Sequence, residues 1–478
     1  MGKQYPNLIG GAWSKADRDA ANINPSNLDE VVGDYAHGSA DDTARAIAAA
    51  QNAQPGWRRA TAQTRGDLLD KVGERIIARE AELGTLLARE EGKTLVEATG
   101  EVQRAGRIFK YFAAEALRAC GEVIPSVRPN VTVDTRREPL GVVGLITPWN
   151  FPIAIPAWKA APALAYGNTV VMKPADNVPA SAWALAEIIH EAGCPAGVFN
   201  LVMGRGSVVG EAMLNSDGID GISFTGSQNI GARVATACVA RFRPFQLEMG
   251  GKNPLVVLDD ADLDAAVEIA LQGAFYSTGQ RCTASSRLIV TKGVYRAFVD
   301  KLAARVDSLV VGDALDPKTQ IGPVVSEDQL KQNLSYVEIG KNEGAKLVKG
   351  GDLSKGATRG HYMRPALFAD VDNAMRIAQE EIFGPVAAVI PADSPEDALR
   401  LANDTPFGLS AGVCTTSLKY ARLFQNELRV GMVMVNLPTA GVELQAPFGG
   451  SRMSSFGPRE QGGAREFFTR VKTSYVQA

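Results

Sequence analysis

Residues 141–147, Gly-Val-Val-Gly-Leu-Ile-Thr, decide the fold, because this short apolar run is typical of a buried β-strand. A second apolar run, Thr-Val-Val-Met-Lys at 169–173, follows it. The alternation continues with an expected helix over 180–192, a strand over 198–202, a helix over 207–214 and a strand over 221–225. Apolar strands that alternate with helices predict a parallel, doubly wound α/β sheet. Such a sheet binds ligands at the carboxyl ends of its strands.

A second set of alternating segments begins near Leu255 and indicates a second α/β domain. Its expected strands cover 255–258, 286–290 and 386–390, and its expected helices lie near 262–278 and 293–310. Earlier in the chain, residues 42–117 carry apolar side chains at helical spacing, so we expect long amphipathic helices that cover a sheet. Residues 123–139 alternate polar and apolar side chains around a Pro-Asn turn. This pattern predicts an extended hairpin that needs another segment or subunit as its partner.

The composition indicates a globular protein that acts on small molecules. Of its 478 residues, 45% are hydrophobic and 22% are charged, which is enough for two or three domains. A net charge of −3 gives no basic surface for nucleic acid, and no apolar run is long enough to span a membrane. The N-terminus lacks a signal core, and the five cysteines and three histidines lack metal-ligand spacing. We therefore expect a cytoplasmic protein without a metal, membrane or nucleic-acid partner.

Cys282 is the strongest candidate for a reactive residue. It follows a predicted helix and lies directly after Arg281, whose guanidinium is permanently charged. A cationic neighbour or a helix terminus lowers the pKa of a thiol and so favours the nucleophilic thiolate. The alternative is an inert, buried cysteine, and the residue alone does not decide between the two.

Two further polar residues have the chemistry that a thiol nucleophile needs. Asn150 lies between two prolines in Pro-Trp-Asn-Phe-Pro, and a fixed amide of this kind can stabilise an oxyanion. Glu248 lies in an apolar setting before Gly-Gly-Lys, where desolvation would raise its pKa toward that of a general base. A turn-forming Asn and a salt-bridged or capping Glu remain the alternatives.

Anion-binding residues are expected at strand ends. Ser227, in Phe-Thr-Gly-Ser, closes a strand and opens a helix, where main-chain N–H groups suit a pyrophosphate. Lys173 and Asp176 follow another strand, where both can reach ribose hydroxyls. The glycine-rich run 204–210 departs from the dinucleotide fingerprint at Val209, which favours an ordinary turn there. Plain turns and exposed loop charges remain the alternatives for the first two motifs.

Together these motifs form a recognisable series along the chain. Its members are Asn150 in PWNFP, Lys173 in KPA, Ser227 in FTGS, Glu248 before GGK, Cys282 in GQRC, Glu381 and Phe383 in EEIFGP, and Phe448 in PFGG. In this order they resemble the aldehyde dehydrogenase superfamily over essentially the whole chain. The resemblance implies an NAD(P)-dependent aldehyde dehydrogenase.

The resemblance also implies a mechanism. Cys282 would attack the aldehyde, the Asn150 amide and the Cys282 main-chain N–H would hold the oxyanion, and a hydride would pass to the nicotinamide. Glu248 would then activate the water that hydrolyses the thioester, and Glu460 matches a family carboxylate implicated in proton relay. Because members that use coenzyme A commonly lack the base, the presence of Glu248 favours a free acid as product.

The family pattern further implies which residues hold the cofactor. Lys173 and Glu381 would hold the two riboses, Ser227 the pyrophosphate, and Trp149 and Phe383 would pack around the cofactor. The expected cofactor site is completed by Thr147, Asp176, Gly206 and Gly226. Many NAD-using relatives carry Glu at position 176 and many NADP-using relatives carry a small residue, so Asp176 leaves both NAD and NADP open.

The resemblance implies an α/β fold with a Rossmann-like cofactor domain, an α/β catalytic domain and a β oligomerisation arm. The expected NAD(P)-binding domain comprises 1–120 and 141–247, the catalytic domain 248–440, and the bridging segment 121–140 and 441–478. The hairpin 121–140 would pair with the C-terminal residues 471–476 and extend the sheet of a neighbouring subunit. A homodimer or homotetramer is therefore expected.

The substrate is expected to be a small, anionic aldehyde. Arg281 offers a planar fork for a carboxylate, although pairing with a structural carboxylate is an equal alternative. The segments 441–448 and 457–462 resemble the branch of the family that acts on 2-oxoglutarate semialdehyde. Succinate semialdehyde and glyceraldehyde 3-phosphate, the latter without phosphorylation, are the alternative substrates. A catalytically silent binding protein and a cysteine hydrolase are the rival functions, but the hydrolase would need a nearby His.

Overall fold

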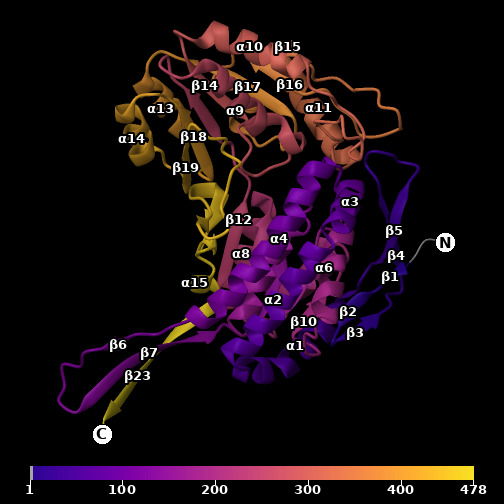
Figure 1. Ribbon diagram of the computed structural model, residues 1–478, viewed down its shortest axis with the longest axis vertical. Coiled ribbons are helices and arrows are strands. Elements are labelled where there is room, and N and C mark those ends of the chain that lie inside the picture. Colours follow the sequence, from indigo (N-terminus) through magenta and orange to yellow (C-terminus); the bar gives the residue numbers. More distant parts are fainter. Residues whose placement is uncertain (1–3, 478) are drawn as a thin grey trace.

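The alternating segments that begin at residue 142 form the centre of an eight-stranded sheet, as the sequence predicts (Figure 1). The computed structural model describes residues 4–477. The parallel strands are β8 (Val142–Ile146), β9 (Thr169–Lys173), β10 (Phe199–Leu201), β11 (Gly221–Gly226) and β12 (Phe245–Met249). Their order is β12-β11-β8-β9-β10, so β9 and β10 are added on one side of β8, and β11 and β12 on the other. The strand order therefore switches between β8 and β11, although all five strands are parallel. Ligands bind beyond the carboxyl ends of the strands at such a switch point.

Short antiparallel strands close both edges of this sheet. They are β2 (Asn7–Ile9), β3 (Ala12–Ser14) and β21 (Ser455–Phe456). The helices of this body are α1 (Ala40–Arg59), α2 (Ala62–Ala78), α3 (Glu80–Glu91), α4 (Leu95–Glu115), α5 (Ala154–Ala165), α6 (Ala180–Glu191), α7 (Glu211–Asn215) and α8 (Gln228–Val239). The long helices predicted within 42–117 are thus present as α1 to α4. The helix expected over 207–214 is split, because the chain first makes a π-helical turn at Gly206–Gly210.

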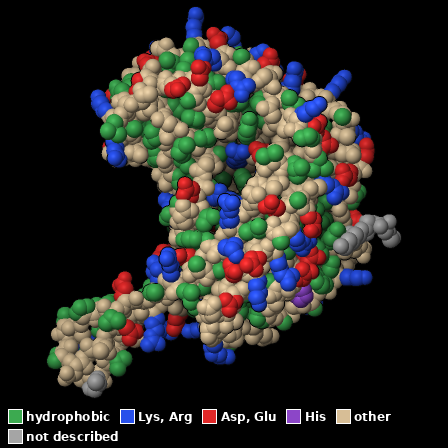
Figure 2. Space-filling model, in the orientation of Figure 1, with side chains coloured by type: hydrophobic (Ala, Val, Ile, Leu, Met, Phe, Trp, Pro, Cys, Tyr) green, Lys and Arg blue, Asp and Glu red, His purple; other side chains and the backbone are tan. Residues whose placement is uncertain are grey.

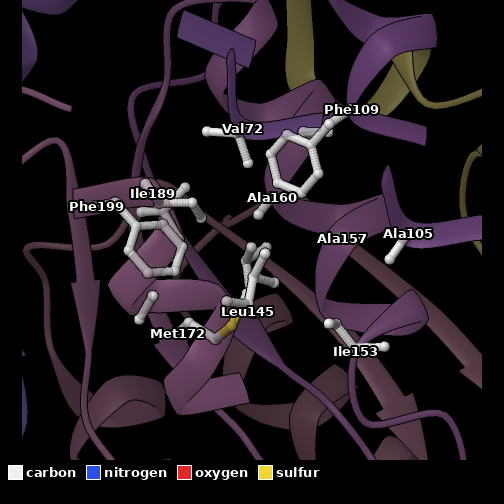
Figure 3. Close-up of a cluster of buried hydrophobic side chains, with 14 of the residues drawn as sticks. Val72, Ala105, Phe109, Leu145, Ile153, Ala157, Ala160, Met172, Ile189 and Phe199 are labelled. Carbon is white, nitrogen blue, oxygen red and sulfur yellow. The ribbon is translucent and has the colours of Figure 1, made fainter. Parts of the chain in front are cut away.

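The core of this body lies between the sheet and the helices on its faces. Figure 3 shows Leu145 of β8 and Met172 of β9 beneath Val72 of α2, Phe109 of α4 and Ile189 of α6, all of them buried. Because helices cover the sheet, its strands are apolar at almost every position and do not alternate. Burying a large apolar side chain of this kind contributes about 1.5–3 kcal/mol, so the core fixes the strands that end at the site.

A second sheet of seven strands forms the other α/β body, in the order β15-β16-β17-β14-β13-β18-β19. Its strands are β13 (Pro254–Val257), β14 (Arg287–Thr291), β15 (Lys346–Lys349), β16 (Ala366–Ala369), β17 (Val386–Ala392), β18 (Ser410–Cys414) and β19 (Met432–Val435). Its helices are α9 (Leu263–Phe275), α10 (Tyr295–Asp307), α11 (Glu327–Asn342), α12 (Arg376–Gln379), α13 (Pro395–Asn403) and α14 (Leu418–Glu427). The second predicted α/β unit is therefore present, although α9 ends before residue 278.

The predicted hairpin projects from the molecule as an arm (Figure 1). It contains β6 (Val123–Ile124) and β7 (Val131–Pro139), and β7 pairs antiparallel with β23 (Thr469–Gln477) from Thr469↔Pro139 to Gln477↔Val131. The predicted pairing with the C-terminal segment is confirmed. Exposed apolar side chains such as Val123, Val127 and Tyr475 remain on the arm.

Several short elements complete the chain. They are β1 (Gln4–Tyr5), β4 (Asp19–Ile23), β5 (Val31–Ala36), β20 (Pro447–Phe448), β22 (Glu460–Gln461) and α15 (Arg465–Phe468). Within residues 4–477, none of the helices combines the length and the apolar character that a membrane crossing needs. The same residues contain no cluster of His, Cys, Asp and Glu that could hold a metal ion.

Candidate active site

The switch point of the first sheet opens into a cavity of about 240 Å³ that reaches the thiol of Cys282. The molecule is deeply hollowed between its two α/β bodies (Figure 2). Of the residues predicted for the site, the cavity wall includes Trp149, Asn150, Gly226, Ser227, Cys282, Glu381 and Phe383. The wall also includes Thr225, Met249, Gln329 and Gln332, which the sequence did not single out. Residues from both bodies therefore meet at one site.

The backbone before Cys282 turns sharply. Helix α9 ends at Phe275, and Ser277 and Thr278 then adopt left-handed φ angles of 52° and 55°. Glu97 of α4 fixes this turn, because its Oε1 accepts hydrogen bonds from the Ser277 main-chain N–H at 2.8 Å and from the Ser277 hydroxyl at 3.1 Å. A strained turn held by a half-buried carboxylate sets the position of the thiol.

The electrostatic setting of Cys282 differs from the sequence prediction. Burial, and after it the nearby carboxyl groups of Glu381 and Glu248, raise the pKa of the Cys282 thiol to about 12. The expected lowering of this pKa by Arg281 is therefore wrong. The thiol needs a base before it can act as a nucleophile.

Arg281 is turned toward a structural partner. Its Nη2 lies 3.0 Å from Glu97 Oε1 and 2.8 Å from the Ser277 hydroxyl. This is the ion-pair alternative that the sequence left open, and it explains why Arg281 does not lower the pKa of the adjacent thiol. The guanidinium stabilises the turn before Cys282.

Asn150 is buried and faces the nucleophile loop. Its Nδ2 donates to the main-chain oxygen of Gln280 at 3.1 Å, two residues before Cys282. Its own main-chain oxygen accepts a hydrogen bond of 2.8 Å from Lys93 Nζ, and Lys93 is paired with Glu101 at 2.6 Å. The amide is thus held rigidly beside the loop of the thiol, where an oxyanion donor needs to be.

Glu248 lies on β12 opposite Ser455 of β21, whose hydroxyl donates to its carboxylate. Burial raises the pKa of Glu248 well above its usual value, and the charge of Glu460 raises it further. The Glu248 carboxylate also adjoins Gly449, where a Cβ would come within 2.5 Å of Oε1 and where φ is +147°. Only glycine fits that position. The predicted direction of the Glu248 pKa shift is confirmed.

Glu460 is part of a buried polar chain. It forms an ion pair with Lys159 of α5, whose Nζ also donates to the Ser223 hydroxyl at 2.7 Å. The Ser223 hydroxyl donates in turn to Gln246 Oε1 at 2.8 Å. The sequence analysis missed Lys159, although a single lysine inside the apolar helix IPAWKAAPALA was a signal.

The cavity wall fits a dinucleotide. Ser227 is the N-cap of α8, yet its side chain does not cap the helix, so both the hydroxyl and the helix N-terminus are available to an anion. The Thr225 hydroxyl is buried without a partner, as expected for a group that a ligand satisfies. Trp149 and Phe383 meet edge to face with ring centroids 5.3 Å apart, and form an aromatic wall.

Glu381 is the carboxylate of this wall. Its Oε1 accepts a hydrogen bond from the Gly251 N–H at 2.8 Å, while burial raises its pKa to about 7. A carboxylate so placed can accept hydrogen bonds from ribose hydroxyls.

The remaining predicted cofactor residues lie at neighbouring strand ends. Thr147 follows β8 and is buried with its hydroxyl unpartnered. Lys173 ends β9, where burial lowers its pKa to about 8, and a Cβ on Gly206 would lie 3.9 Å from its side chain. Asp176 is exposed beyond it. These four residues do not line the cavity that reaches Cys282, but Lys173 and Gly206 adjoin each other.

Comparison with known proteins agrees with this geometry. The model of the aldehyde dehydrogenase family matches residues 13–474. The alpha-ketoglutaric semialdehyde dehydrogenase of Bacillus subtilis is 48% identical, covering 99% of this chain and 98% of its own length. The alpha-ketoglutarate semialdehyde dehydrogenase of Haloferax volcanii is 45% identical, covering 98% of both chains. The structure of Staphylococcus aureus betaine aldehyde dehydrogenase in complex with NAD+ is 34% identical, with a TM-score of 0.96, and covers 99% of this chain and 95% of that chain. The chain therefore belongs to the aldehyde dehydrogenase family and is an NAD(P)-dependent aldehyde dehydrogenase.

Proposed function

We propose that this enzyme oxidises 2-oxoglutarate semialdehyde to 2-oxoglutarate through a thioester on Cys282. The observation that carries the proposal is that the Cys282 thiol and the Asn150 amide share one cavity with the aromatic wall of Trp149 and Phe383. The names of the Bacillus subtilis and Haloferax volcanii relatives support this choice of aldehyde.

The first step is attack by sulfur on the aldehyde carbon. The S–C bond forms while the thiol proton passes to solvent water in the cavity, so the Glu248 carboxylate stays free to act as the base in hydrolysis. The aldehyde oxygen becomes an oxyanion that the Asn150 Nδ2–H and the Cys282 main-chain N–H stabilise. Each such donor lowers the activation free energy by about 2.7–4 kcal/mol.

The nicotinamide of bound NAD(P) supplies the acceptor for the hydride that leaves the substrate carbon. Trp149 and Phe383 would form the wall beside this ring, Glu381 would accept hydrogen bonds from ribose, and Ser227 with the N-terminus of α8 would bind pyrophosphate. These residues also exclude water from the thiol while the thioester forms.

Hydrolysis completes the cycle. Glu248 removes a proton from water, the water oxygen attacks the thioester carbon, and the C–S bond breaks to give the carboxylic acid and the thiol. The Glu460 and Lys159 pair, which adjoins Glu248, passes the proton onward. The presence of the base favours hydrolysis over transfer to coenzyme A.

Initial rates test the proposed substrate. Purified enzyme is assayed by NAD(P)H absorbance with 2-oxoglutarate semialdehyde, succinate semialdehyde, glyceraldehyde 3-phosphate and the neutral aldehyde pentanal. We expect the highest kcat/KM for 2-oxoglutarate semialdehyde and free 2-oxoglutarate as its product, even when coenzyme A is present. A higher kcat/KM for succinate semialdehyde would select the alternative substrate, and the acyl-coenzyme A as main product would refute the hydrolytic step.

The same assays with each cofactor rank NAD against NADP. We expect both to be used, because Asp176 is shorter than Glu and is exposed, which leaves room for a 2′-phosphate. Its charge opposes that phosphate, while Lys173 attracts it. The substitution Asp176→Ala should therefore shift the ratio of kcat/KM values toward NADP.

The arm and the unpaired cysteines bear on assembly and location. A homodimer or homotetramer forms through the arm, whose apolar side chains Val123, Val127 and Tyr475 are exposed in one copy. Sedimentation should give a dimer or tetramer, and truncation after Phe468, which removes β23, should give a smaller species. All five cysteines are unpaired, which supports a reducing cytoplasm.

A further inference from the structure

Arg104 of α4 is a charged side chain that the proposed mechanism does not use. Its Nη1 donates to the Val442 main-chain oxygen at 2.9 Å and its Nη2 to Gln461 Oε1 at 3.3 Å. The guanidinium carbon lies 5.9 Å from the centroid of the Trp158 ring. Its hydrogen-bond partners in residues 4–477 are neutral, and burial lowers its pKa, against which only the charge of Glu101 acts. A partly buried cation without a counter-ion is costly, which points to an anion that joins it.

Three N–H donors lack an acceptor at this place. Arg104 Nε, Trp158 Nε1 and Gln461 Nε2 are each buried without a hydrogen-bond partner in the described chain. Gln461 is 1% exposed and Trp158 is 6% exposed. Buried donors are rarely left unpaired, and three of them around one guanidinium match the acceptor oxygens of a carboxylate.

The nearest carboxylate does not satisfy these donors. Glu101 lies one turn before Arg104 on α4, but its Oε2 is paired with Lys93 at 2.6 Å. Its Oε1 accepts hydrogen bonds from the main-chain N–H groups of Ile153 and Ala154 at 3.2 and 3.1 Å. Both oxygens of Glu101 are therefore occupied, and the charge of Arg104 remains available.

A short loop connects this donor cluster with the nucleophile. The Thr439 hydroxyl donates at 2.7 Å to the main-chain oxygen of Thr283, the residue after Cys282. Val442, three residues further on, accepts the hydrogen bond from Arg104. Three extended residues span at most about 11 Å, so a short loop links the partner of the guanidinium to the residue after the nucleophile.

The cluster lies apart from the aromatic cavity wall. Neither Arg104 nor Trp158 nor Gln461 lines the cavity of Ser227 and Glu381. The Trp158 ring instead packs against Phe448 with centroids 5.4 Å apart. The cluster thus occupies a wall formed by α4, α5 and the C-terminal loop, apart from the residues proposed to hold the cofactor.

We infer that Arg104, Trp158 and Gln461 form a subsite for the distal carboxylate of the aldehyde substrate. The inference rests on the proposed oxidation of an anionic semialdehyde and replaces Arg281, which Glu97 neutralises. In a five-carbon semialdehyde, the aldehyde carbon and the carboxylate carbon are separated by about 5 Å, and a hydrogen bond adds about 2.9 Å. The proposed subsite therefore requires the guanidinium to lie about 8 Å from the aldehyde carbon of the bound substrate.

Kinetics of Arg104→Gln test the subsite. We expect KM for 2-oxoglutarate semialdehyde to rise about 50-fold, because a charge-assisted contact is lost, while kcat/KM for pentanal stays within about threefold. The matched control is Arg107→Gln, one turn further on the same helix, whose side chain is exposed. Arg107→Gln should change neither KM for 2-oxoglutarate semialdehyde nor kcat/KM for pentanal. Arg104→Lys keeps the charge but loses the fork, so a rise of about fivefold is expected.

A second measurement uses glutarate, a saturated dicarboxylate, as an inhibitor of pentanal oxidation. Glutarate should inhibit wild-type enzyme competitively and should lose most of its effect on Arg104→Gln. If Arg104→Gln does not fold, Arg104→Lys tests the subsite through the ratio of kcat/KM for 2-oxoglutarate semialdehyde to kcat/KM for pentanal. An unchanged ratio in the folded variants, with inhibition by glutarate retained, would overturn the subsite. Wild-type enzyme that prefers pentanal to every semialdehyde would instead refute the proposed substrate class.

Discussion

The Lys93 ammonium lies 2.8 Å from the main-chain oxygen of Asn150 and donates a hydrogen bond to it. The same nitrogen is paired with Glu101 at 2.6 Å, and both side chains are almost fully buried. Four residues after Lys93, Glu97 accepts a hydrogen bond from the Ser277 main-chain N–H. The junction of α3 and α4 therefore holds the Asn150 loop and the loop before the thiol at once.

The substitution Lys93→Met should lower kcat while it leaves KM almost unchanged. Loss of the bond to Asn150 loosens an oxyanion donor, so we expect kcat to fall about 10- to 100-fold with little change in KM. Removing one partner of a buried ion pair should also lower the free energy of unfolding by about 3–5 kcal/mol. Urea denaturation and initial rates measure both effects.

The double variant Lys93→Met, Glu101→Gln provides the control. It should regain part of the lost stability, because the uncompensated carboxylate is removed, yet kcat should stay low. Wild-type kcat in Lys93→Met would show that the contact with Asn150 does not matter for catalysis.

The substitution Glu248→Gln should stop the reaction after one turnover. Without the base, water attacks the thioester slowly, so a rapid burst of NAD(P)H should precede a steady rate reduced at least about 100-fold. Stopped-flow absorbance records both phases. In wild-type enzyme the steady rate should rise with pH as Glu248, with its raised pKa, becomes ionised. A Glu248→Gln variant with a normal steady rate would exclude this role.

Buried carboxyl groups should make the fold less stable as pH rises. Burial raises the pKa of Glu91 to about 8, and its Oε1 has no hydrogen-bond partner in the described residues. Because the folded pKa lies above the unfolded one, the unfolded state binds fewer protons between about pH 4.5 and 8, and stability falls across that window.

The substitution Glu91→Gln should therefore reduce the fall in unfolding free energy as pH rises. We expect the slope of unfolding free energy against pH to decrease by up to about 1.4 kcal/mol per pH unit. Denaturant titrations at pH 5, 6, 7 and 8 measure the slope. Equal slopes for wild type and variant would contradict the assignment.

Glu381→Ala should weaken cofactor binding without aldehyde present. We expect Kd for NAD, measured by calorimetry, to rise about 10-fold, because a carboxylate acceptor for ribose is lost. Since burial raises the pKa of Glu381 to about 7, wild-type affinity should increase from pH 6 to 8 and the variant should lose this increase. Glu380→Ala is the control, as that side chain binds Arg376 and Tyr336. Unchanged affinity in Glu381→Ala would place ribose elsewhere.

Local patterns predicted most of the fold. The strands at 142–146 and 169–173 lie within or match the predicted ranges, because sheets covered on both faces need continuous apolar runs. The hairpin was also predictable, since it alternates polar and apolar residues, and its C-terminal partner followed from the family resemblance. The early end of α9 was not, because the turn at Ser277 depends on Glu97, far away in sequence.

The charges that act on Cys282 could not be predicted from its neighbours in the sequence. Arg281 suggested an activated thiol, but its charge is neutralised by Glu97, while Glu381 and Glu248 surround Cys282. The donors of Arg104 and its two neighbours converge only after three distant segments pack together. The sequence analysis missed Lys159, although its pattern carried a signal, because a lone charge inside an apolar helix needs a buried partner.

The central claim is that a thioester forms on Cys282. Its most direct test is mass spectrometry of peptides from Glu248→Gln enzyme, quenched in acid after mixing with 2-oxoglutarate semialdehyde and NAD(P). The account predicts the mass of the acyl group on the peptide that contains Cys282, in proportion to the NAD(P)H burst, and none on Cys194 or Cys414. A full burst without acylated Cys282, or undiminished turnover by Cys282→Ser, would contradict it.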